Sequence, residues 1–268
     1  MSFTYASVVR SVELTRRLRR ITLHIDDPAG LGIPPAADAA VGVYFDAAPD
    51  FAGRNYSVRH HDADHIDIDV VLHASGPGTT WARTVKPGAR VGLDHARSWH
   101  RPDPQSEWHL LISDLSGLPA LARIMSGHPA GTPATAVVEV ADRADLDYLP
   151  SHPDIEVVAT VGTGNGATRS RLTELVRDLP MPATRGYCWF AGEAAESRAV
   201  RKHVRQLDWS IEQYDITGYW RADSQLWDRR FALVEADVVA VYTRALAAGK
   251  GDKIAFEEFD EALERVGL

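Results

Sequence analysis

Four apolar runs in the second half of the chain constrain the fold more than any other feature. They read EWHLLIS, ATAVVEVA, IEVVATV and GYCWFAGE, and none keeps a strict alternation of apolar and polar residues. Strands that are covered on both faces have this composition. Helical patterns alternate with them, namely LPALARIMSG, TRSRLTELVRDL and AAESRAVRKHVRQL, and IEQYDITGYWR follows as a last strand. The alternation predicts an α/β domain with a doubly wound parallel sheet over residues 106–223.

Residues 1–105 follow a different pattern, with short strands between clusters of Pro, Gly and Asp. The predicted strands cover 4–14, 18–25, 40–47, 54–61, 65–73 and 89–95, and one short helix is predicted near 78–85. Ile66, Ile68 and Val70 alternate with Asp67 and Asp69, which is typical of a strand with one buried face. Six such strands predict a small antiparallel β-barrel.

The last part of the chain, residues 224–268, is predicted to be a helical extension. Apolar residues recur every three or four positions from Trp227 to Ala245, which predicts one long amphipathic helix that ends near Gly249. FEEFDEALERV predicts a second, shorter helix. The extension can pack against its own domain, form a dimer contact or act as a lid. The sequence leaves these alternatives open, and with them the oligomeric state.

Charge and composition exclude several classes of protein. The formal net charge of −8 argues against nucleic acid as a partner, because phosphate binding needs a basic face. Cys188 is the single cysteine, so an intrachain disulfide is impossible and no cysteine cluster can bind a metal. No apolar run approaches the roughly 18 residues that span a bilayer. The N-terminus also lacks the core of a signal peptide. We therefore expect a cytoplasmic protein with no membrane segment.

The stretch GRNYSVRHH at 53–61 places arginine, tyrosine and serine together in one predicted strand. The guanidinium of Arg54 suits a pyrophosphate. Tyr56 points to the same face and suits stacking on a flat ring, and Ser57 can hydrogen-bond the polar edge of that ring. A solvent-exposed strand with a cross-strand tyrosine is the alternative interpretation.

The stretch LHASGPGTTWA at 72–82 leads from a strand through Gly76 and Gly78 into a helix. The free amides at a helix start, with the hydroxyls of Thr79 and Thr80 nearby, make an anion site. An ordinary capped helix is the alternative. Together with Arg54, one phosphate site built from both segments is the better interpretation.

Two further stretches concern the α/β domain. WFAGEAAESRAVR at 189–201 ends a strand at Gly192, where a nicotinamide cofactor can approach the backbone closely. VGTGNGA at 161–167 satisfies a dinucleotide-binding pattern, but it follows the third strand of the domain and is predicted to be a loop. HHDADH at 60–65 gathers three histidines and two aspartates, yet its position between two strands predicts a hairpin turn and no metal site.

The stretches RNYSVR, VLHASGPGTTWA, KPGARV, WFAGEAAESRAVR and GYWR occur in a familiar order and spacing. From about residue 5 to 222 the chain resembles siderophore-interacting proteins, which are flavin-dependent ferric-siderophore reductases of the ferredoxin-reductase-like superfamily. The resemblance implies noncovalent FAD on the N-terminal barrel, NADH or NADPH on the second domain, and reduction of a ferric siderophore to Fe(II). It implies no catalytic side chain, because the cofactor carries the redox chemistry.

The resemblance and the motifs together predict a set of site residues. Cofactor contacts are predicted at Arg54, Asn55, Tyr56, Ser57, Val71, Leu72, His73, Gly76, Gly78, Thr79, Thr80, Trp81, Asp114, Ala191, Gly192 and Glu193. Substrate contacts are predicted at Arg59 and Arg221, while Arg97 and Arg101 are further basic residues that lie in a segment where the sequence departs from the family pattern.

The sequence departs from the family pattern in two places. LDHARSW at 93–99 stands where the family has a GPRGS-like segment, which affects part of the cofactor contact, and SDLSGLPA at 113–120 replaces GDETALPA, which affects nicotinamide affinity. Asp142 suits the 2′-hydroxyl of NADH and Arg143 suits the 2′-phosphate of NADPH, so that choice stays open. Three other functions stay open as well: a flavin reductase that serves another electron acceptor, a flavin-free siderophore-binding module, and an assembly subunit.

Overall fold

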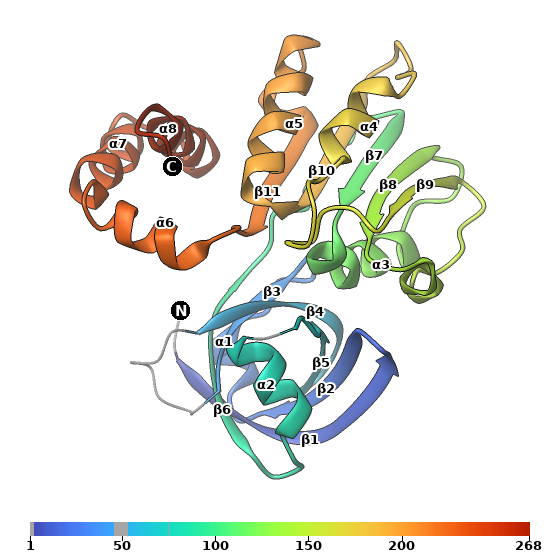
Figure 1. The fold of residues 1–268 in the computed structure, drawn as a ribbon, viewed down its shortest axis with the longest axis vertical. Coiled ribbons are helices and arrows are strands. Elements are labelled where there is room, and N and C mark those ends of the chain that lie inside the picture. The colour runs from blue at the N-terminus through green and yellow to red at the C-terminus, as the bar shows by residue number, and fades with distance from the viewer. Residues whose placement is uncertain (1–2, 46–52, 75) are drawn as a thin grey trace. The chain divides into compact units, whose positions relative to one another are not determined.

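The computed structural model describes residues 3–45, 53–74 and 76–268. The chain forms two compact units, Met1–Tyr219 and Trp220–Leu268. The first unit contains a closed antiparallel barrel followed by a second, five-stranded sheet, as Figure 1 shows. The second unit is helical. The predicted fold class is therefore confirmed.

The barrel closes in the order β1-β2-β5-β4-β3-β6. Every neighbouring pair among these strands is antiparallel. The strands are β1 (Thr4–Thr15), β2 (Leu18–Ile25), β3 (Ala40–Tyr44), β4 (Arg54–Asp62), β5 (His65–Val71) and β6 (Arg90–Arg97). All six lie where the sequence predicts them, although residues 46 and 47 of the predicted third strand lie outside the described residues. Closure matters for stability because it leaves no strand edge unpaired.

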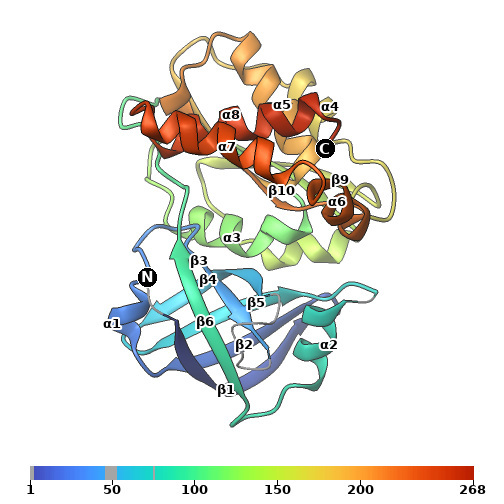
Figure 2. The ribbon, with the colours of Figure 1, turned by 90° about the vertical axis from the view of Figure 1, so that its left-hand side faces the viewer.

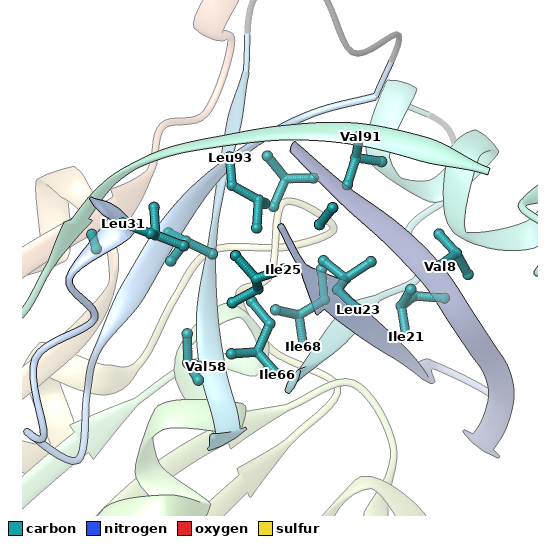
Figure 3. Packing of buried hydrophobic residues seen from close by; sticks show 14 of the residues in the cluster. Val8, Ile21, Leu23, Ile25, Leu31, Val58, Ile66, Ile68, Val91 and Leu93 are labelled. Atoms are coloured by element: carbon teal, nitrogen blue, oxygen red, sulfur yellow. The ribbon is translucent and has the colours of Figure 1, made fainter. Parts of the chain in front are cut away.

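Alternation of apolar residues fills the barrel. Ile66, Ile68 and Val70 are at most 1% exposed, and they meet Val58 of β4 and Leu93 of β6 in one core. Figure 3 shows these side chains converging from the strands, apart from Val70, which is not labelled there. Full burial of one such side chain stabilises the fold by about 1.5–3 kcal/mol. The two residues between β4 and β5, Ala63 and Asp64, make a tight turn, so HHDADH is a hairpin as predicted.

Two short helices accompany the barrel. Asp27 is the N-cap residue of helix α1 (Pro28–Leu31), and its side chain accepts from the amide of Gly30. Helix α2 (Pro77–Thr84) follows β5 and confirms the helix predicted near 78–85. Figure 2 shows α1 and α2 beside the barrel.

The second sheet has the order β11-β10-β7-β8-β9. Strand β7 (Trp108–Ser113) pairs in parallel with β10 (Gly186–Glu193) and with β8 (Ala134–Val140), and β8 pairs in parallel with β9 (Ile155–Val161). Strand β11 (Tyr214–Trp220) lies at the other edge. Strand β7, the first strand of this sheet in the sequence, therefore lies in the middle. Strands β8 and β9 lie on one side of it and β10 and β11 on the other, so the strand order reverses at the place where β7 meets β10. Such a topological switch point is where α/β sheets bind ligands.

Helices cover both faces of this sheet, which confirms the doubly wound arrangement. Helix α3 (Leu118–Ser126) and the 3-10 turns η1 (Leu115–Gly117) and η2 (Arg143–Tyr148) pack on one face. Helices α4 (Leu172–Asp178) and α5 (Ala194–Gln206) pack on the other, and η3 (Ile211–Gln213) precedes β11. Strand β9 differs from its prediction as a strand covered on both faces. It is an edge strand, and Val157 and Val161 are 42% and 43% exposed.

Hydrogen bonds from α3 and from η2 help to join the barrel to the α/β part of the first unit. A guanidinium N–H of Arg123, in α3, donates to the carbonyl of Val58 in β4 at 2.8 Å. The hydroxyl of Tyr148, in η2, donates to the buried carboxylate of Asp69 in β5. The polar face of β5 is thus used for this contact.

The second unit contains α6 (Ser224–Phe231), α7 (Glu235–Ala247) and α8 (Asp252–Arg265). The prediction of one long helix from 224 to 248 is wrong, because Ala232, Leu233 and Val234 separate α6 from α7. The break lets Trp227 and Phe231 pack with Val238 and Leu263 in a small core. Across the described residues, no helix combines the length and apolarity that a membrane crossing requires.

Candidate functional site

Strand β4 presents its predicted site residues in two alternating sets. Val58 points into the barrel core, so Tyr56 and Arg54 lie on that side and Ser57 lies on the opposite side. The pairing agrees, since Tyr56 stands opposite the core residue Val41. Arg54 is exposed, and its guanidinium donates to the carbonyl of Gly53 at 3.1 Å. Tyr56 and Arg54 therefore share one side, as predicted, while Asn55 and Ser57 form the other set. The register of β4 against β5 shifts between Val58 and His60, so Arg59 lies at an irregularity of the strand.

Tyr56 contacts the start of α2. A Cβ added at Gly78 would stand 2.1 Å from the Tyr56 hydroxyl oxygen, so the glycine is what allows the ring to approach. Phe45 lies 6.2 Å from the Tyr56 ring and stacks on Trp81 at 4.8 Å. Burial raises the pKa of Tyr56, which keeps its hydroxyl protonated. The two stretches RNYSVR and GPGTTWA thus meet, although they are distant in the sequence.

The start of α2 has a glycine as its N-cap residue. Gly76 has a φ of 127°, a conformation suited to glycine, and it supplies no side-chain hydrogen bond to the amides of the first turn. Thr79 differs from the prediction that its hydroxyl faces an anion. It is buried, and its hydroxyl accepts from the amide of His73 at 3.0 Å, so it holds the turn together. Thr80 is exposed.

The remaining predicted residues of this stretch surround the turn. Val71 ends β5, Leu72 packs against the barrel core, and the His73 side chain is exposed. Ser75, which lies within the predicted pyrophosphate segment, is outside the described residues.

On the other side of β4, Ser57 lies near residues that were not predicted for the cofactor site. Ser57 and Arg97 both pair with Ala40, so their side chains share one face of the barrel. Arg97 lies over the Trp99 ring at 5.2 Å, and its Nε is buried without a hydrogen-bond partner among the described residues. Tyr219 of β11 lies 6.3 Å from Trp99 and beside the Ser57 hydroxyl. A polar ligand at this place would satisfy the Arg97 nitrogen.

The altered segment LDHARSW retains an ordered backbone. His95 adopts a φ of 48°, and the register of β6 against β3 shifts between Gly42 and Ala40. A bulge of this kind redirects the strand and needs a residue in the left-handed region. His95 therefore adopts, at this bulge, a left-handed backbone conformation that a glycine would adopt without strain.

Asp38 fixes the connection between the two halves of the first unit. Its carboxylate is fully buried and accepts from the amide of Trp99 at 3.1 Å and from that of His100 at 2.8 Å. It also accepts from the indole of Trp189 in β10 at 3.3 Å. Burial raises the pKa of Asp38, while these donors oppose that effect. One carboxylate thus joins a barrel loop, the connecting segment and the second sheet.

Asp114, Ala191, Gly192 and Glu193 meet at the switch point between β7 and β10. The amide of Asp114 donates to the carbonyl of Ala191 at 3.3 Å. A Cβ added at Gly192 would stand 3.1 Å from the Asp114 carboxyl carbon, and one at Gly117 would stand 2.5 Å from the Ala191 carbonyl oxygen. The structure therefore brings together the four residues that the sequence predicts for the α/β domain.

The carboxylates at this place already have partners within the protein. Asp114 is 1% exposed and accepts from the amide of Ser116 at 2.8 Å. Glu193 caps α5 and accepts from the amide of Ala195 at 2.6 Å. Both groups shape the ends of the strands, because they satisfy amides that would otherwise be unpaired.

The loop VGTGNGA is confirmed as a connection between β9 and α4. It wraps around Glu139 of β8, which is 1% exposed and accepts from the Thr163 hydroxyl at 2.7 Å and from the Arg171 amide at 2.8 Å. Gly164 has a φ of 60°, and a Cβ there would stand 1.7 Å from Glu139 Oε2. The inner donors of the loop thus bind the protein's own carboxylate rather than a phosphate.

The two predicted substrate arginines belong to different units. Arg59 lies in the first unit, and its buried Nε lacks a partner among the described residues. Arg221 belongs to the second unit, where its guanidinium stacks on the Trp227 ring at 4.0 Å. A shared substrate site for the two stays a prediction. Within the described residues, no group of three or more His, Cys, Asp or Glu side chains is arranged to hold a metal ion.

Comparison with known protein families agrees with this architecture. A family model described as "Siderophore-interacting FAD-binding domain" matches residues 33–97, in the barrel. A second, described as "Siderophore-interacting protein", matches residues 106–223, which contain the parallel sheet.

Individual relatives carry related names. The ferric vibriobactin reductase ViuB of Vibrio cholerae is 31% identical over 178 residues, which are 63% of this chain and 64% of ViuB. The chain thus spans slightly less than two thirds of that relative. The NADPH-dependent ferric-chelate reductase of Escherichia coli is 26% identical over 209 residues, 75% of this chain and 78% of the relative.

A solved structure extends the comparison to three dimensions. The siderophore utilization protein from T. fusca is 27% identical, with a TM-score of 0.72 over 83% of this chain and 94% of that chain. The barrel, the switch-point sheet and both family models therefore agree, and the chain belongs to the siderophore-interacting protein family.

Proposed function

We propose that this protein is a ferric-siderophore reductase that uses noncovalent FAD and NADH or NADPH. The observation that carries the proposal is the meeting of Tyr56 with Gly78 at the uncapped start of α2, on a barrel joined to a switch-point sheet. An aromatic ring beside free helix amides suits a flat ring attached to a pyrophosphate. The named relatives that reduce ferric chelates support the same assignment.

The residues present fit a flavin. Arg54 and the first-turn amides of α2 would hold the pyrophosphate, and Tyr56 would contact the ring. The unpartnered Nε of Arg97 offers a donor for a polar edge, with Ser57 on the same face of the barrel. Tyr219 lies beside Ser57 and is part of this proposed site.

The switch point supports the nicotinamide half of the proposal. Ala191 and Gly192 are buried at the carboxyl end of β10, next to Asp114. Small residues at this position let a flat ring approach the backbone. Their role would be to orient the donor, while Asp114 and Glu193 keep the two strand ends in place through the bonds to Ser116 and Ala195.

The chemistry that FAD supplies when bound is the conversion of a two-electron hydride donor into two one-electron reductions of iron. Because iron arrives chelated, the protein needs no iron-binding side chains of its own. Arg59 and Arg221 are proposed to attract the chelate, and a cytoplasmic location is part of the same proposal. Their charges would favour an anionic chelate over a neutral one.

The experiment is a visible absorption spectrum of the purified protein under anaerobic conditions, before and after addition of NADH or NADPH. We expect flavin bands that bleach with the nicotinamide and recover when a ferric siderophore is added, with an Fe(II) trap reporting the product. Bleaching without Fe(II) release, but with reduction of ferricyanide or a quinone, would favour a reductase that serves another acceptor. A colourless protein that binds no added FAD would reject the proposal in favour of a flavin-free binding module.

A further inference from the structure

The segment that connects the barrel to the parallel sheet, residues 98–107, is held by buried carboxylates. Asp38 accepts from two of its amides, that of Trp99 at 3.1 Å and that of His100 at 2.8 Å. Asp215 of β11 accepts from the next amide along the chain at 2.9 Å. Hydrogen bonds to an ionised acceptor are among the stronger ones in proteins. Three successive amides of the segment are therefore fixed by one carboxylate from the barrel side and one from the sheet.

Asp38 also lies next to a hydrogen bond to the strand that carries the proposed flavin contacts. The following residue, Ala39, accepts through its carbonyl from the amide of Val58 at 2.6 Å. Val58 belongs to β4 and comes directly after Ser57, on the strand that also carries Tyr56. A shift of Asp38 would therefore be passed to the β4 backbone at the proposed flavin site.

The two carboxylates have their other partners on one face of β10, the strand proposed to meet the nicotinamide. The indole N–H of Trp189 donates to Asp38 at 3.3 Å. The hydroxyl of Tyr187 donates to Asp215 at 2.7 Å. Tyr187, Trp189 and Ala191 occupy alternate positions of the strand and pack in the same core. The carboxylates therefore hold the face of β10 that leads to Ala191, a proposed nicotinamide contact.

Asp38 and Asp215 act together as a carboxylate clamp on this junction. Burial raises the pKa of Asp38, its three N–H donors lower it, and the charge of Asp215 adds a smaller increase, so the two groups lie within electrostatic reach of each other. The amide of Arg101 ties the clamp to β10 as well, because it donates to Asp215 and also to the hydroxyl of Tyr187 at 3.2 Å. The contacts thus form one connected network.

We propose that Asp38, supported by Asp215, is a positioning residue for hydride transfer from the nicotinamide to the flavin. In this step a C–H bond of NADH or NADPH breaks and the hydride bonds to the flavin, so that its two electrons reduce FAD and leave NAD⁺ or NADP⁺. The clamp would set the separation between β10 and β4, where the two rings are proposed to lie. The inference rests on the proposed function, and it adds residues that lie outside the proposed cofactor contacts. A misplacement of about 1 Å can lower a rate about 100-fold.

The test measures the two half-reactions of the FAD-loaded full chain separately by anaerobic stopped-flow absorbance. In the first, NADH or NADPH reduces FAD, which needs both halves of the first unit in register. In the second, ferricyanide reoxidises protein that dithionite has reduced, which needs the flavin alone. Asp38→Asn should lower the limiting rate of the first half-reaction by about tenfold or more and change the second by less than about twofold. The nicotinamide concentration at half the limiting rate should change by less than about threefold, because the proposed binding residues are intact.

A second variant decides the question if Asp38→Asn does not fold. Tyr187→Phe removes only the hydroxyl that joins β10 to Asp215. It should slow the first half-reaction by about threefold or more and leave the second within about twofold.

The matched control is Asp103→Asn, in the same connecting segment. Asp103 accepts from Arg185 at 2.5 Å, directly before β10, and so binds the segment to the sheet alone. Both half-reactions of this variant should stay within about twofold of the wild-type rates. Unchanged FAD content and circular dichroism would show that a variant is folded.

A spectroscopic readout does not depend on turnover. A long-wavelength charge-transfer absorbance arises when the nicotinamide and flavin rings stack, because their π orbitals must overlap. This absorbance should weaken in Asp38→Asn and in Tyr187→Phe and persist in Asp103→Asn.

The outcomes separate this inference from the function on which it rests. If neither NADH nor NADPH reduces the FAD of the wild-type protein, the proposed function fails and the inference fails with it. If the wild type is reduced but the folded clamp variant slows both half-reactions equally, or slows neither, the inference is overturned while the function stands. A control that loses the first half-reaction selectively would also overturn it. Selective loss in the clamp variant alone supports the positioning role.

Discussion

At the scale of single residues, the site depends on one close approach between two segments. Gly78 leaves room for the Tyr56 hydroxyl, and Gly76 adopts a φ that other residues avoid. Neither requirement follows from residue type alone, because a glycine turn before a helix is common. The contact gives both glycines a specific physical reason.

Gly78→Ala should destabilise the protein by about 1–3 kcal/mol, because the new methyl group overlaps the Tyr56 hydroxyl. In a Tyr56→Phe background the oxygen is gone, and the nearest ring carbon would lie at the ordinary contact distance of 3.4 Å. The same substitution should then cost little. Urea unfolding of the four proteins in this double-mutant cycle measures the coupling, and additive effects would contradict the contact.

Arg54→Ala should weaken FAD binding by roughly tenfold or more, because a charge-assisted bond to a phosphate is lost. Riboflavin carries no phosphate and should lose little affinity. Fluorescence titration of apoprotein with each flavin measures both. Equal losses for the two ligands would argue against a phosphate role for Arg54.

At the scale of elements, the Glu139 carboxylate organises the glycine-rich loop after β9. Its carboxylate accepts donors from Thr163 and Arg171, and Gly164 allows the approach. Asn165 extends the arrangement, since its side-chain oxygen accepts from the amide of Leu115 at 2.9 Å. The loop after β9 is thus tied to the turn after β7.

Glu139→Ala should destabilise the protein by about 2–4 kcal/mol, because the Thr163 hydroxyl and the Arg171 amide lose a buried, charged acceptor at once. The loop should also become accessible, which hydrogen exchange at residues 162–171 would detect. Glu174→Ala, an exposed acid on α4, is the matched control and should change stability by less than about 1 kcal/mol. A Glu139→Ala protein as stable as the control would contradict the role assigned to this carboxylate.

At the scale of the whole molecule, buried polar groups hold the halves of the first unit together. Asp38 joins three segments, and a histidine cluster lies near the start of β7. His109 contacts His128 at 5.1 Å and Tyr187 at 5.3 Å, and His100 contacts Tyr187 at 5.7 Å. These rings come from separate segments of the chain, so protonation of His100 or His109 would disturb the contacts between those segments.

Burial, reinforced by the nearby His128, lowers the pKa of His100 and of His109 to about 4. In the unfolded chain both titrate near an ordinary value of about 6.5. Between these values the unfolded chain binds more protons than the folded one, so stability must fall as the pH decreases from about 6.5 to about 4.

The melting temperature measured across this pH range tests the prediction. A His100→Gln, His109→Gln double variant should show a flatter dependence, even if it is less stable throughout. The same slope in both proteins would show that other groups control the acid sensitivity. Because Asp38 also has a shifted pKa, the comparison between the two proteins is more informative than either curve alone.

Local patterns in the sequence determined the element types, the order of barrel and α/β sheet, and the family. Alternation at Ile66, Ile68 and Val70 and the uninterrupted apolar runs specify which faces are buried, and these patterns need no knowledge of distant residues. The first residues of the candidate site, Arg54, Tyr56 and Gly78, came from motifs of the same local kind.

Tertiary structure alone decided what depends on contacts between distant segments. The apolar pattern of β9 looks like a covered strand, yet the strand lies at a sheet edge, because strand order is not written in a local pattern. The tail pattern continues through Leu233, but packing of Trp227 and Phe231 with Leu263 accompanies a break. Asp142 and Arg143 are equal candidates in the sequence, and only the capping box and Arg17 show that the carboxylate is already engaged. A residue's chemistry is set by its type, but its availability is set by the partners that folding brings to it.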